Sequence, residues 1–218
     1  MEDYSLLRKG KIKIGMLSTF GCLNIIDKLS IFQRENPQIE IIVTIGNSKT
    51  LLNLLQTHEL DVAFVIISGN LLELGGIELT KILEDPMMVM LPKGHSLCRH
   101  SHIDFSDLEG ESIIMPAKTS GLYQPILSGF VSEGIEPKIV CETSHPELCV
   151  QMVSSGMGIA FASARVVSAN QGYPFHAAHL KNQIPRSIYY AALKDTRDIQ
   201  SIQRFSNYIM QEYLDRQL

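Results

Sequence analysis

The sequence predicts an α/β protein made of two similar lobes that are joined by two crossover strands. The order strand-helix-strand-helix-strand occurs once in each half of the chain. The segments that lead from the second to the third strand, residues 46–61 and 143–158, have equal length. Two further apolar strands, residues 84–91 and 186–193, supply one connection in each direction between the halves.

The first half begins with a strand and alternates with amphipathic helices. Residues 11–17 alternate as in a strand, and the following apolar residues recur at helical spacing. Residues 39–45 are β-branched almost throughout, which is typical of a parallel strand covered on both faces. The expected elements are strands 11–17, 39–45 and 61–67 and helices 23–34 and 49–57.

The second half repeats this order with different residues. The expected elements are strands 112–115, 138–142 and 158–162 and helices 122–133 and 146–155. The pair Gly156-Met157-Gly158 resembles half of a dinucleotide fingerprint, but it follows a helix and precedes a strand. We therefore interpret it as a turn that ends the helix.

The two apolar crossover strands define the lobe boundaries. The last helix, residues 199–213, has an apolar stripe and is expected to return to the first lobe. We expect lobe I to contain residues 11–86 and 187–218 and lobe II to contain residues 87–186, with residues 1–10 as a linker remnant or leading segment. Two connections of this kind allow lobes to open and close as a hinge.

Composition excludes several partners. The 218 residues contain 19 Lys and Arg and 23 Asp and Glu, and the formal net charge is −4. The charges form no blocks, so the sequence shows no footprint for nucleic acid or an anionic membrane. No apolar run approaches the roughly 18 residues that cross a bilayer, and the N-terminus lacks the order of a secretion signal. We expect a cytoplasmic protein with no membrane partner.

The four cysteines, Cys22, Cys98, Cys141 and Cys149, contain no C-x-x-C pair. Reduced thiols are expected in a cytosolic protein. Cys22 has the best setting for a reactive thiolate, because it lies near the expected start of the first helix.

Small polar residues follow the expected strands of both halves. Ligands of parallel α/β sheets bind beyond the carboxyl ends of the strands, where loops and helix N-termini present N–H groups. Such a site suits a small polar or carboxylated molecule. The alternative is that each residue only caps its own helix, since Ser, Thr and Asn are preferred N-caps. The residues concerned are Ser18, Thr19, Asn47, Ser48, Ile67, Ser68, 117–120, Thr143 and Ser144.

Motifs for catalysis and metal binding are absent from the sequence. No nucleophile elbow, phosphate loop or H-E-x-x-H pattern occurs, so we expect no enzyme; His58 and His145 are expected on solvated helix ends. The loop "HSLCRHSH" could supply metal ligands, but its spacing matches no standard zinc site. We expect a surface loop there, and neither a metal nor a cofactor.

Several motifs in one order carry a family resemblance over residues 10–215. They are "GKIKIG", "IFQRENPQIEIIV", "GNSKTLLNLLQTHELDVAFV", "LPKGHSL", "DFSDLEGESIIM" and "VSSGMGIAFA". Together they resemble the effector-binding domain of LysR-type transcriptional regulators. The segment L-x-x-x-E-L-D-V-A at residues 55–63 is among the most specific parts.

The resemblance implies a fold, a ligand and partners. The fold would be two Rossmann-like lobes of the periplasmic-binding-protein type II kind, with an effector in the cleft between them. These domains would form a homodimer, and a tetramer in the full-length regulator. The winged helix-turn-helix domain of the family is not in this sequence, so DNA would be bound only through that missing N-terminal domain.

By position, the effector-binding loops of the family match residues of both lobes. Ile66 and Ile67 are apolar and Lys118 is the one cation that we expect there, which favours a neutral or singly charged metabolite over a dianion. The alternatives are a stand-alone solute-binding protein or an enzyme on the same fold. The predicted effector-binding residues are Ser18, Thr19, Asn47, Ser48, Ile66, Ile67, Ser68, Lys118, Thr143 and Ser144.

Overall fold

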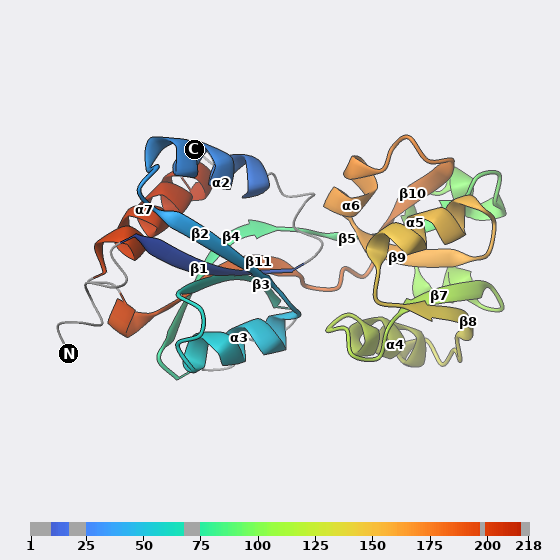
Figure 1. The fold of residues 1–218 in the computed structure, drawn as a ribbon. Coiled ribbons are helices and arrows are strands. Elements are labelled where there is room, and N and C mark those ends of the chain that lie inside the picture. The colour runs from blue at the N-terminus through green and yellow to red at the C-terminus, as the bar shows by residue number, and fades with distance from the viewer. Residues whose placement is uncertain (1–9, 18–24, 68–74, 197–198, 215–218) are drawn as a thin grey trace. The chain divides into compact units, whose positions relative to one another are not determined.

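The computed structural model describes residues 10–17, 25–67, 75–196 and 199–214, and these form two compact units (Figure 1). Unit 1 contains the described residues up to Glu84 and from Ser187 onward, and unit 2 contains Asp85–Arg186. The apolar pattern of the sequence predicts the first boundary after residue 86, two residues further along the chain. Asp85 instead belongs to unit 2, because its side chain and its backbone N–H both bond to Arg186.

Unit 1 is one five-stranded sheet with helices on both faces. Its strands lie in the order β2-β1-β3-β11-β4; β2, β1 and β3 are parallel, and β11 is antiparallel to both of its neighbours. The elements are β1 (Lys11–Met16), α2 (Ile25–Glu35), β2 (Glu40–Ile45), α3 (Ser48–Gln56), β3 (Val62–Ile67), β4 (Ile77–Glu84), β11 (Ser187–Leu193) and α7 (Gln200–Leu214).

Strand β2 differs from the prediction that both of its faces are covered. It forms the edge of the sheet and pairs with β1. Val43 is 43% exposed and Ile45 is 58% exposed. The β-branched run therefore reflects strand propensity and an apolar surface, not burial within this chain.

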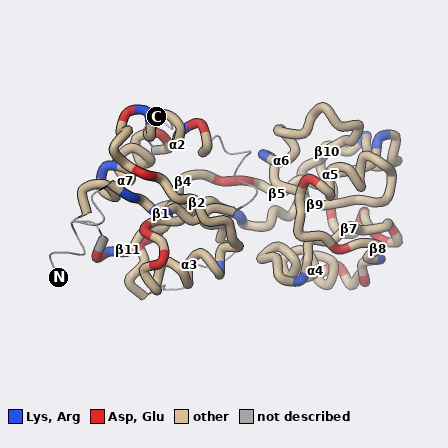
Figure 2. The backbone as a smooth tube through the Cα atoms, in the orientation of Figure 1, with Lys and Arg blue, Asp and Glu red and all other residues tan. Residues whose placement is uncertain are grey.

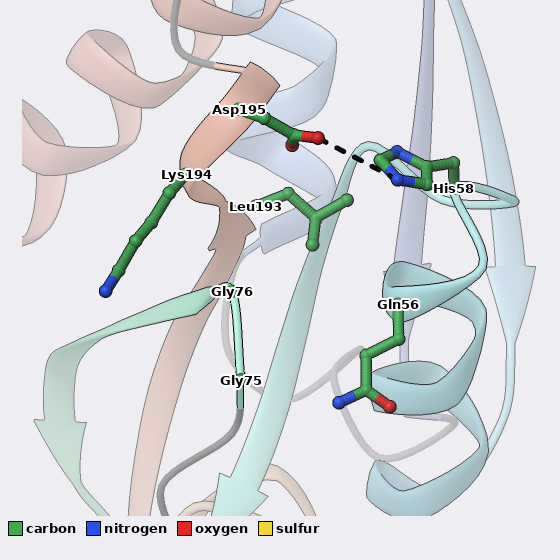
Figure 3. Close-up of a pocket in the computed structure, with 7 residues that line it drawn as sticks. All are labelled: Gln56, His58, Gly75, Gly76, Leu193, Lys194 and Asp195. Atoms are coloured by element: carbon green, nitrogen blue, oxygen red, sulfur yellow. Dashed lines mark ion pairs between the residues drawn. The ribbon is translucent and has the colours of Figure 1, made fainter.

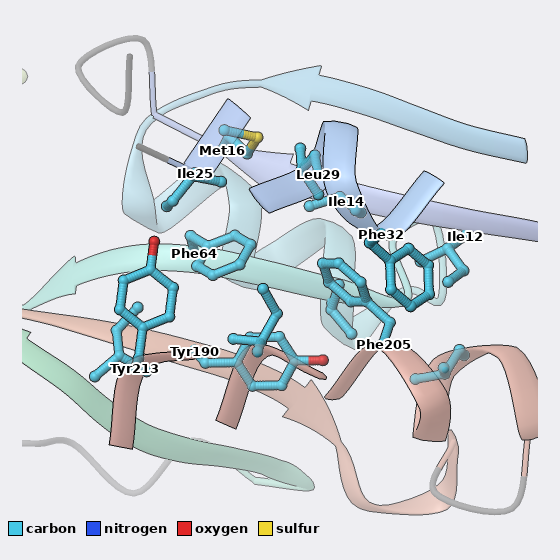
Figure 4. Packing of buried hydrophobic residues seen from close by; sticks show 14 of the residues in the cluster. Ile12, Ile14, Met16, Ile25, Leu29, Phe32, Phe64, Tyr190, Phe205 and Tyr213 are labelled. Atoms are coloured by element: carbon cyan, nitrogen blue, oxygen red, sulfur yellow. The ribbon is translucent and has the colours of Figure 1, made fainter. Parts of the chain in front are cut away.

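Side chains alternate between the two faces of β3, and each face has its own core. Val62 and Phe64 pack with α2 and α7, whereas Ala63 and Val65 pack with α3. In the first core, Phe205 of α7 makes edge-to-face contacts with Phe32 and Phe64 (Figure 4). The apolar stripe of the last helix is thus buried in unit 1. At β1, a Cβ on Gly15 would lie 2.6 Å from the Leu60 Cδ1 atom, so the strand and the α3 side pack closely.

Unit 2 is a six-stranded sheet in the order β6-β10-β5-β9-β7-β8. Strands β9, β7 and β8 are parallel, and β5 is antiparallel to both β9 and β10. The elements are β5 (Met87–Pro92), β6 (His102–Ile103), β7 (Ser112–Pro116), α4 (Tyr123–Ser132), β8 (Lys138–Thr143), α5 (Pro146–Ser154), β9 (Ile159–Ser163), α6 (Ala164–Ala169) and β10 (Phe175–Leu180), with short 3-10 turns at Ser96–Arg99 and Phe105–Leu108 and, in unit 1, at Lys194–Thr196.

Several elements differ from those that the sequence predicts. The expected strand 84–91 is the end of β4 and most of β5, which are interrupted at Asp85-Pro86. Pro lacks the N–H group that continues a ladder. The strands β4, β6 and β10 and the helix α6 were not predicted. The turn before β9 was predicted correctly: α5 ends at Ser154, and Gly156 has a φ of +83°.

Candidate functional site

In unit 1, the residues after β2 and β3 are joined by hydrogen bonds. The Asn47 Oδ1 atom accepts a hydrogen bond from the Thr50 N–H at 2.9 Å and caps α3. The Ser48 hydroxyl donates to the Ile66 carbonyl at 2.9 Å and accepts from the Ile66 N–H at 3.0 Å. Ser48 therefore fixes the start of α3 against the end of β3.

Asn47 therefore caps its own helix, as in the alternative considered for the strand-end residues, and Ser48 bonds to the backbone of Ile66. Asn47 is exposed, and Ile66 and Ile67 are half-buried at the end of β3. Because β1, β2 and β3 are parallel, these residues lie at one edge of the sheet. Ser18, Thr19 and Ser68, which were predicted to share this edge, lie outside the described residues.

In unit 2, the ends of β7 and β8 are tied together. The Ala117 N–H donates to the Thr143 carbonyl at 2.9 Å, and the Thr143 Oγ1 atom accepts from the His145 N–H at 3.1 Å just before α5. Ser144 and Lys118 are exposed beside them. The structure thus brings Lys118, Thr143 and Ser144 to the same edge of the unit 2 sheet.

The residues after the third parallel strand of unit 2 were not among the predicted site residues. β9 lies beside β7, and it ends at Ser163, whose buried hydroxyl accepts a hydrogen bond from the Val166 N–H. Arg165 follows two residues later. The signal was available, because the strand-end rule that gave Ile67 and Ser68 after β3 applies equally to the residues after β9.

Arg165 adjoins a buried ion pair at the two crossover points. The Arg186 guanidinium pairs with the Asp85 carboxylate, and both side chains are at least nine-tenths buried. The Asp85 N–H also donates to the Arg186 carbonyl at 3.2 Å, and the Arg165 backbone N–H donates to the Asp85 Oδ1 atom at 3.4 Å. The cluster therefore holds two cations and one anion.

Unit 1 also contains a pocket of about 420 Å³ away from the carboxyl ends of its parallel strands. Its lining includes Gln56, Leu193 and Lys194, and His58 points toward Asp195 with 3.8 Å between the His58 Nε2 and Asp195 Oδ2 atoms (Figure 3). Leu193 ends β11, and the preceding Ala192 pairs with Val62, the first residue of β3. The pocket thus lies at the opposite end of the sheet from Asn47 and Ile67, and His58 is half-exposed after α3.

The histidine loop of unit 2 is held by local bonds. The His95 Nδ1 atom accepts from the Leu97 N–H at 3.3 Å, and its Nε2 atom lies 3.3 Å from Glu111. His102 stacks on His179 with ring centroids 5.4 Å apart. Within the described ranges, no three His, Cys, Asp or Glu side chains are grouped as metal ligands.

The described thiols are unevenly buried. Cys149, on the first turn of α5, is buried, and burial together with the nearby Cys141 and Glu147 raises the pKa of its thiol to about 11. Such a thiol is almost fully protonated at neutral pH. Cys22, the predicted reactive thiol, lies outside the described residues.

Charges are mixed along both units. Figure 2 shows Lys and Arg interspersed with Asp and Glu in the described part of the chain. Among the described residues, each helix is too short or too polar to cross a bilayer.

The family is decided by a model match that covers almost the whole chain. Residues 6–213 match the LysR substrate binding domain. The chain belongs to this family. The resemblance inferred from the motifs is therefore confirmed, and the relatives are transcriptional regulators rather than enzymes.

Two regulators illustrate the similarity of this LysR domain in sequence. It is 27% identical over 159 residues to the HTH-type transcriptional regulator CysL of Bacillus subtilis, covering 73% of this chain and 52% of CysL. It is 30% identical over 163 residues to CbbR of Xanthobacter flavus, covering 74% of this chain and 48% of CbbR. The chain thus spans about half the length of the regulators that it matches.

Solved structures confirm the predicted two-lobe α/β fold of LysR effector domains. The regulatory domain of Synechocystis CcmR, in complex with 2-PG, has a TM-score of 0.81 and 22% identity, covering 94% of this chain and 98% of that one. The effector binding domain of QuiR, in complex with shikimate, has a TM-score of 0.77 and 23% identity with the same coverages. The BenM effector binding domain was solved with its effector benzoate and has a TM-score of 0.78 at 19% identity, covering 95% of this chain and 94% of that one.

Proposed function

We propose that this chain is the ligand-sensing domain of a bacterial transcription regulator, and that one small molecule contacts the strand-end loops of both units. The observation that carries the proposal is the matched arrangement of the units. In each, parallel strands end at one edge where a helix begins, α3 after Asn47 and α5 after His145. Helix N-termini at such an edge present N–H donors to a ligand.

The residues at these edges favour a neutral or singly charged metabolite. Ile66 and Ile67 offer apolar contact in unit 1, while Thr143, Ser144 and the exposed Lys118 offer polar contact and one ammonium in unit 2. Ser18, Thr19, Asn47, Ser48 and Ser68 complete the proposed set. A ligand of this kind would act by binding one arrangement of the two units more tightly than another.

A thermal-shift screen tests the sensing function. The panel contains 2-PG, shikimate and benzoate, which are bound by the structural relatives, together with neutral metabolites. A true effector at 100 times its dissociation constant adds about 2.7 kcal/mol of stability. Saturable stabilisation by at least one compound is expected. Failure of every compound in a broad metabolite panel would count against a sensing role.

We also propose that the domain forms a homodimer through exposed apolar edges. In unit 1, Val43 and Ile45 of the edge strand β2 and Ile26 of α2 are exposed. In unit 2, Ile139 and Val140 of the edge strand β8 are exposed as well. Edge strands with apolar side chains readily pair with another chain, and a second copy offers the same surfaces.

Sedimentation velocity over a concentration series tests this dimer. The double variant Val43→Lys/Ile45→Lys should weaken dimerisation by about tenfold or more, because charges would be buried without partners. The matched control is Tyr173→Lys, which adds a charge at an exposed aromatic residue away from both edge strands. Equal dimerisation of all three proteins would exclude β2 from the interface.

The proposals on DNA and on the full-length assembly rest on the regulators that this chain matches, of which it spans about half the length. We propose that the domain acts in the cytoplasm, that the full-length regulator is a tetramer, and that DNA is bound by a domain outside these 218 residues. Co-purification of a full-length regulator with its promoter DNA, and loss of DNA binding by this domain alone in a gel-shift assay, would support this division.

A further inference from the structure

The carboxyl ends of the parallel strands in unit 2 form a short row. Pro116 of β7 is in register with Thr143 of β8, and Ile114 of β7 is in register with Ala160 of β9. Continuing that second register brings the end of β9, at Ser163, level with the end of β7. Because neighbouring strands are about 4.8 Å apart, the outer ends of the row are about 10 Å apart. A single metabolite can therefore contact residues from two of these strands.

The end of β9 carries an unbalanced positive charge. The Asp85 carboxylate, which is bonded to the backbone there, is paired with the Arg186 guanidinium inside unit 2. Arg165 reaches Asp85 only through its backbone N–H group. Among the described residues, no carboxylate lies within ion-pair distance of the Arg165 side chain. An anion would balance this charge.

The two arginines of this cluster also carry unused hydrogen-bond donors. The Nε atoms of Arg165 and Arg186 are both buried, and neither has a hydrogen-bond partner among the described residues. Arg186 as a whole is 8% exposed. A buried N–H without an acceptor is unfavourable, and the N–H groups of a guanidinium fit the two oxygens of a carboxylate.

We propose that the effector carries a carboxylate and that Arg165 binds this carboxylate beside the end of β9. This inference rests on the proposed sensing function and names the chemical class of its ligand. Lys118 is exposed, so its ammonium is well hydrated and selects less strongly than the partly buried fork of Arg165. A single carboxylate agrees with the preference for a singly charged metabolite.

Ligand binding at Arg165 would also affect the two segments that connect the units, which begin at Asp85 and Arg186. Arg165 is bonded to Asp85, which begins unit 2, and Asp85 is bonded to Arg186, which ends it. A ligand carboxylate that binds the Arg165 side chain would therefore contact a residue whose backbone N–H is bonded to Asp85. Ligand charge and the crossover segments thus share one hydrogen-bonded cluster.

Arginine Nε–H spectra and thermal shifts test the proposal with named probes. The probes are benzoate, shikimate and acetate as carboxylates, and benzamide as the neutral counterpart of benzoate. The variants are Arg165→Met, which keeps an apolar stem, Arg165→Lys, which keeps the charge without the fork, and the matched control Lys138→Ala, which removes an exposed cation at the opposite end of β8. Unliganded melting temperatures establish that each variant is folded.

We expect at least one carboxylate to shift the Arg165 Nε–H signal saturably and to stabilise the wild type, while benzamide does neither. Its affinity should fall about tenfold or more in Arg165→Met, less in Arg165→Lys, and about twofold or less in Lys138→Ala. Equal carboxylate affinity in Arg165→Met and the wild type would overturn the inference, as would the absence of any saturable shift.

The failure of this inference is distinguishable from failure of the sensing function. If neutral metabolites of the wider panel stabilise the chain and no carboxylate does, the domain senses a ligand but Arg165 does not recognise it by charge. If neither group stabilises the chain, both proposals are wrong.

Discussion

The strand-end edges of unit 1 and unit 2 have the same geometry but different chemistry. In unit 1, the polar side chains Asn47 and Ser48 bond to backbone groups, and the neighbouring Ile66 and Ile67 are apolar. In unit 2, Lys118 and Arg165 bring positive charge, and Asp85 and Arg186 form a buried pair beside them. The same arrangement of parallel strands therefore presents mainly apolar and backbone-bonded groups to a ligand in unit 1 and positive charge in unit 2.

The largest expected effect comes from the buried pair of unit 2. Asp85→Asn leaves the Arg186 charge buried without its anion and should cost about 3–5 kcal/mol of unfolding free energy. The double variant Asp85→Asn/Arg186→Met should recover part of this loss, because an apolar side chain of similar length replaces the orphaned charge. Urea denaturation measures both.

The control for the buried pair lies in unit 1. Lys11→Ala removes an exposed ion pair with Glu40, whose charged atoms are 3.1 Å apart, and should cost less than about 1 kcal/mol. Equal losses for Asp85→Asn and Lys11→Ala would contradict the distinction between the buried ion pair of unit 2 and the exposed ion pair of unit 1.

The space around one glycine in each unit shows how tightly the two units are packed. A Cβ on Gly158 of unit 2 would lie 2.5 Å from the backbone carbonyl oxygen of Ser112, whereas a Cβ on Gly15 of unit 1 first meets the end of the Leu60 side chain. Gly158→Ala should therefore cost about 2–3 kcal/mol and Gly15→Ala about 1 kcal/mol, because a side-chain tip yields more easily than backbone.

Gly172→Ala is the control for these glycines, since a Cβ there meets nothing within 4 Å. Its unfolding free energy should stay within about 0.5 kcal/mol of the wild type. A smaller loss for Gly158→Ala than for Gly15→Ala would show that β9 and β7 can separate more readily than the packing suggests.

A third prediction concerns the charge of unit 2 at high pH. Burial raises the pKa of Cys149 in the fold to about 11 from its ordinary value of 9.0, so the folded protein holds the proton more tightly. This stabilisation is complete below pH 9 and is lost as pH rises from about 9 to 11. At pH 10 the loss should approach about 1.4 kcal/mol as an upper limit.

Cys149→Ala should flatten this loss of stability between pH 8 and 10. Measurement stops at about pH 10, because burial raises the pKa of Tyr190 in the fold. Above that pH the unfolded chain loses the tyrosine proton while the folded chain keeps it, which adds a second loss of stability. An unchanged slope in Cys149→Ala would assign the pH dependence to other groups.

The smallest expected effect concerns Asn47 of unit 1. Asn47→Ala removes the α3 cap and should cost about 1 kcal/mol, whereas Asn47→Asp keeps an accepting oxygen and should cost much less. Effector-induced stabilisation separates the two roles. If both variants lose it, Asn47 contacts the ligand; if only Asn47→Ala loses it, the cap alone positions the loop.

Much of the fold follows from the apolar pattern. Strands such as β3 and helices such as α7 are long enough for their periodicity to be distinct, and they end within two residues of the predicted bounds. β4 and β10 were missed because "IELTKILE" and "FHAAHL" mix polar and apolar residues without a clear period. The exposure of Val43 on β2 could not be predicted, since an apolar side chain does not indicate whether it packs within its own chain or lies on the surface.

The candidate site was predictable only in part. The strand-end rule located Asn47, Ser48, Thr143 and Ser144, but it could not show that Ser48 bonds to Ile66. Arg165 was not predicted, because the strand-end rule was not extended to the residues after β9, although the cap residue Ser163 precedes Arg165 there. Its relation to Asp85, 80 residues away in the chain, exists only in the folded unit.

The bond between Asp85 and Arg186 has a consequence for modularity. It joins residues 101 positions apart, so the first and last residues of unit 2 are neighbours. A segment whose ends meet can be inserted into a surface loop of another protein without stretching the host. Residues 85–186 therefore form a segment whose two ends are adjacent, which suits its insertion into a surface loop of a reporter enzyme.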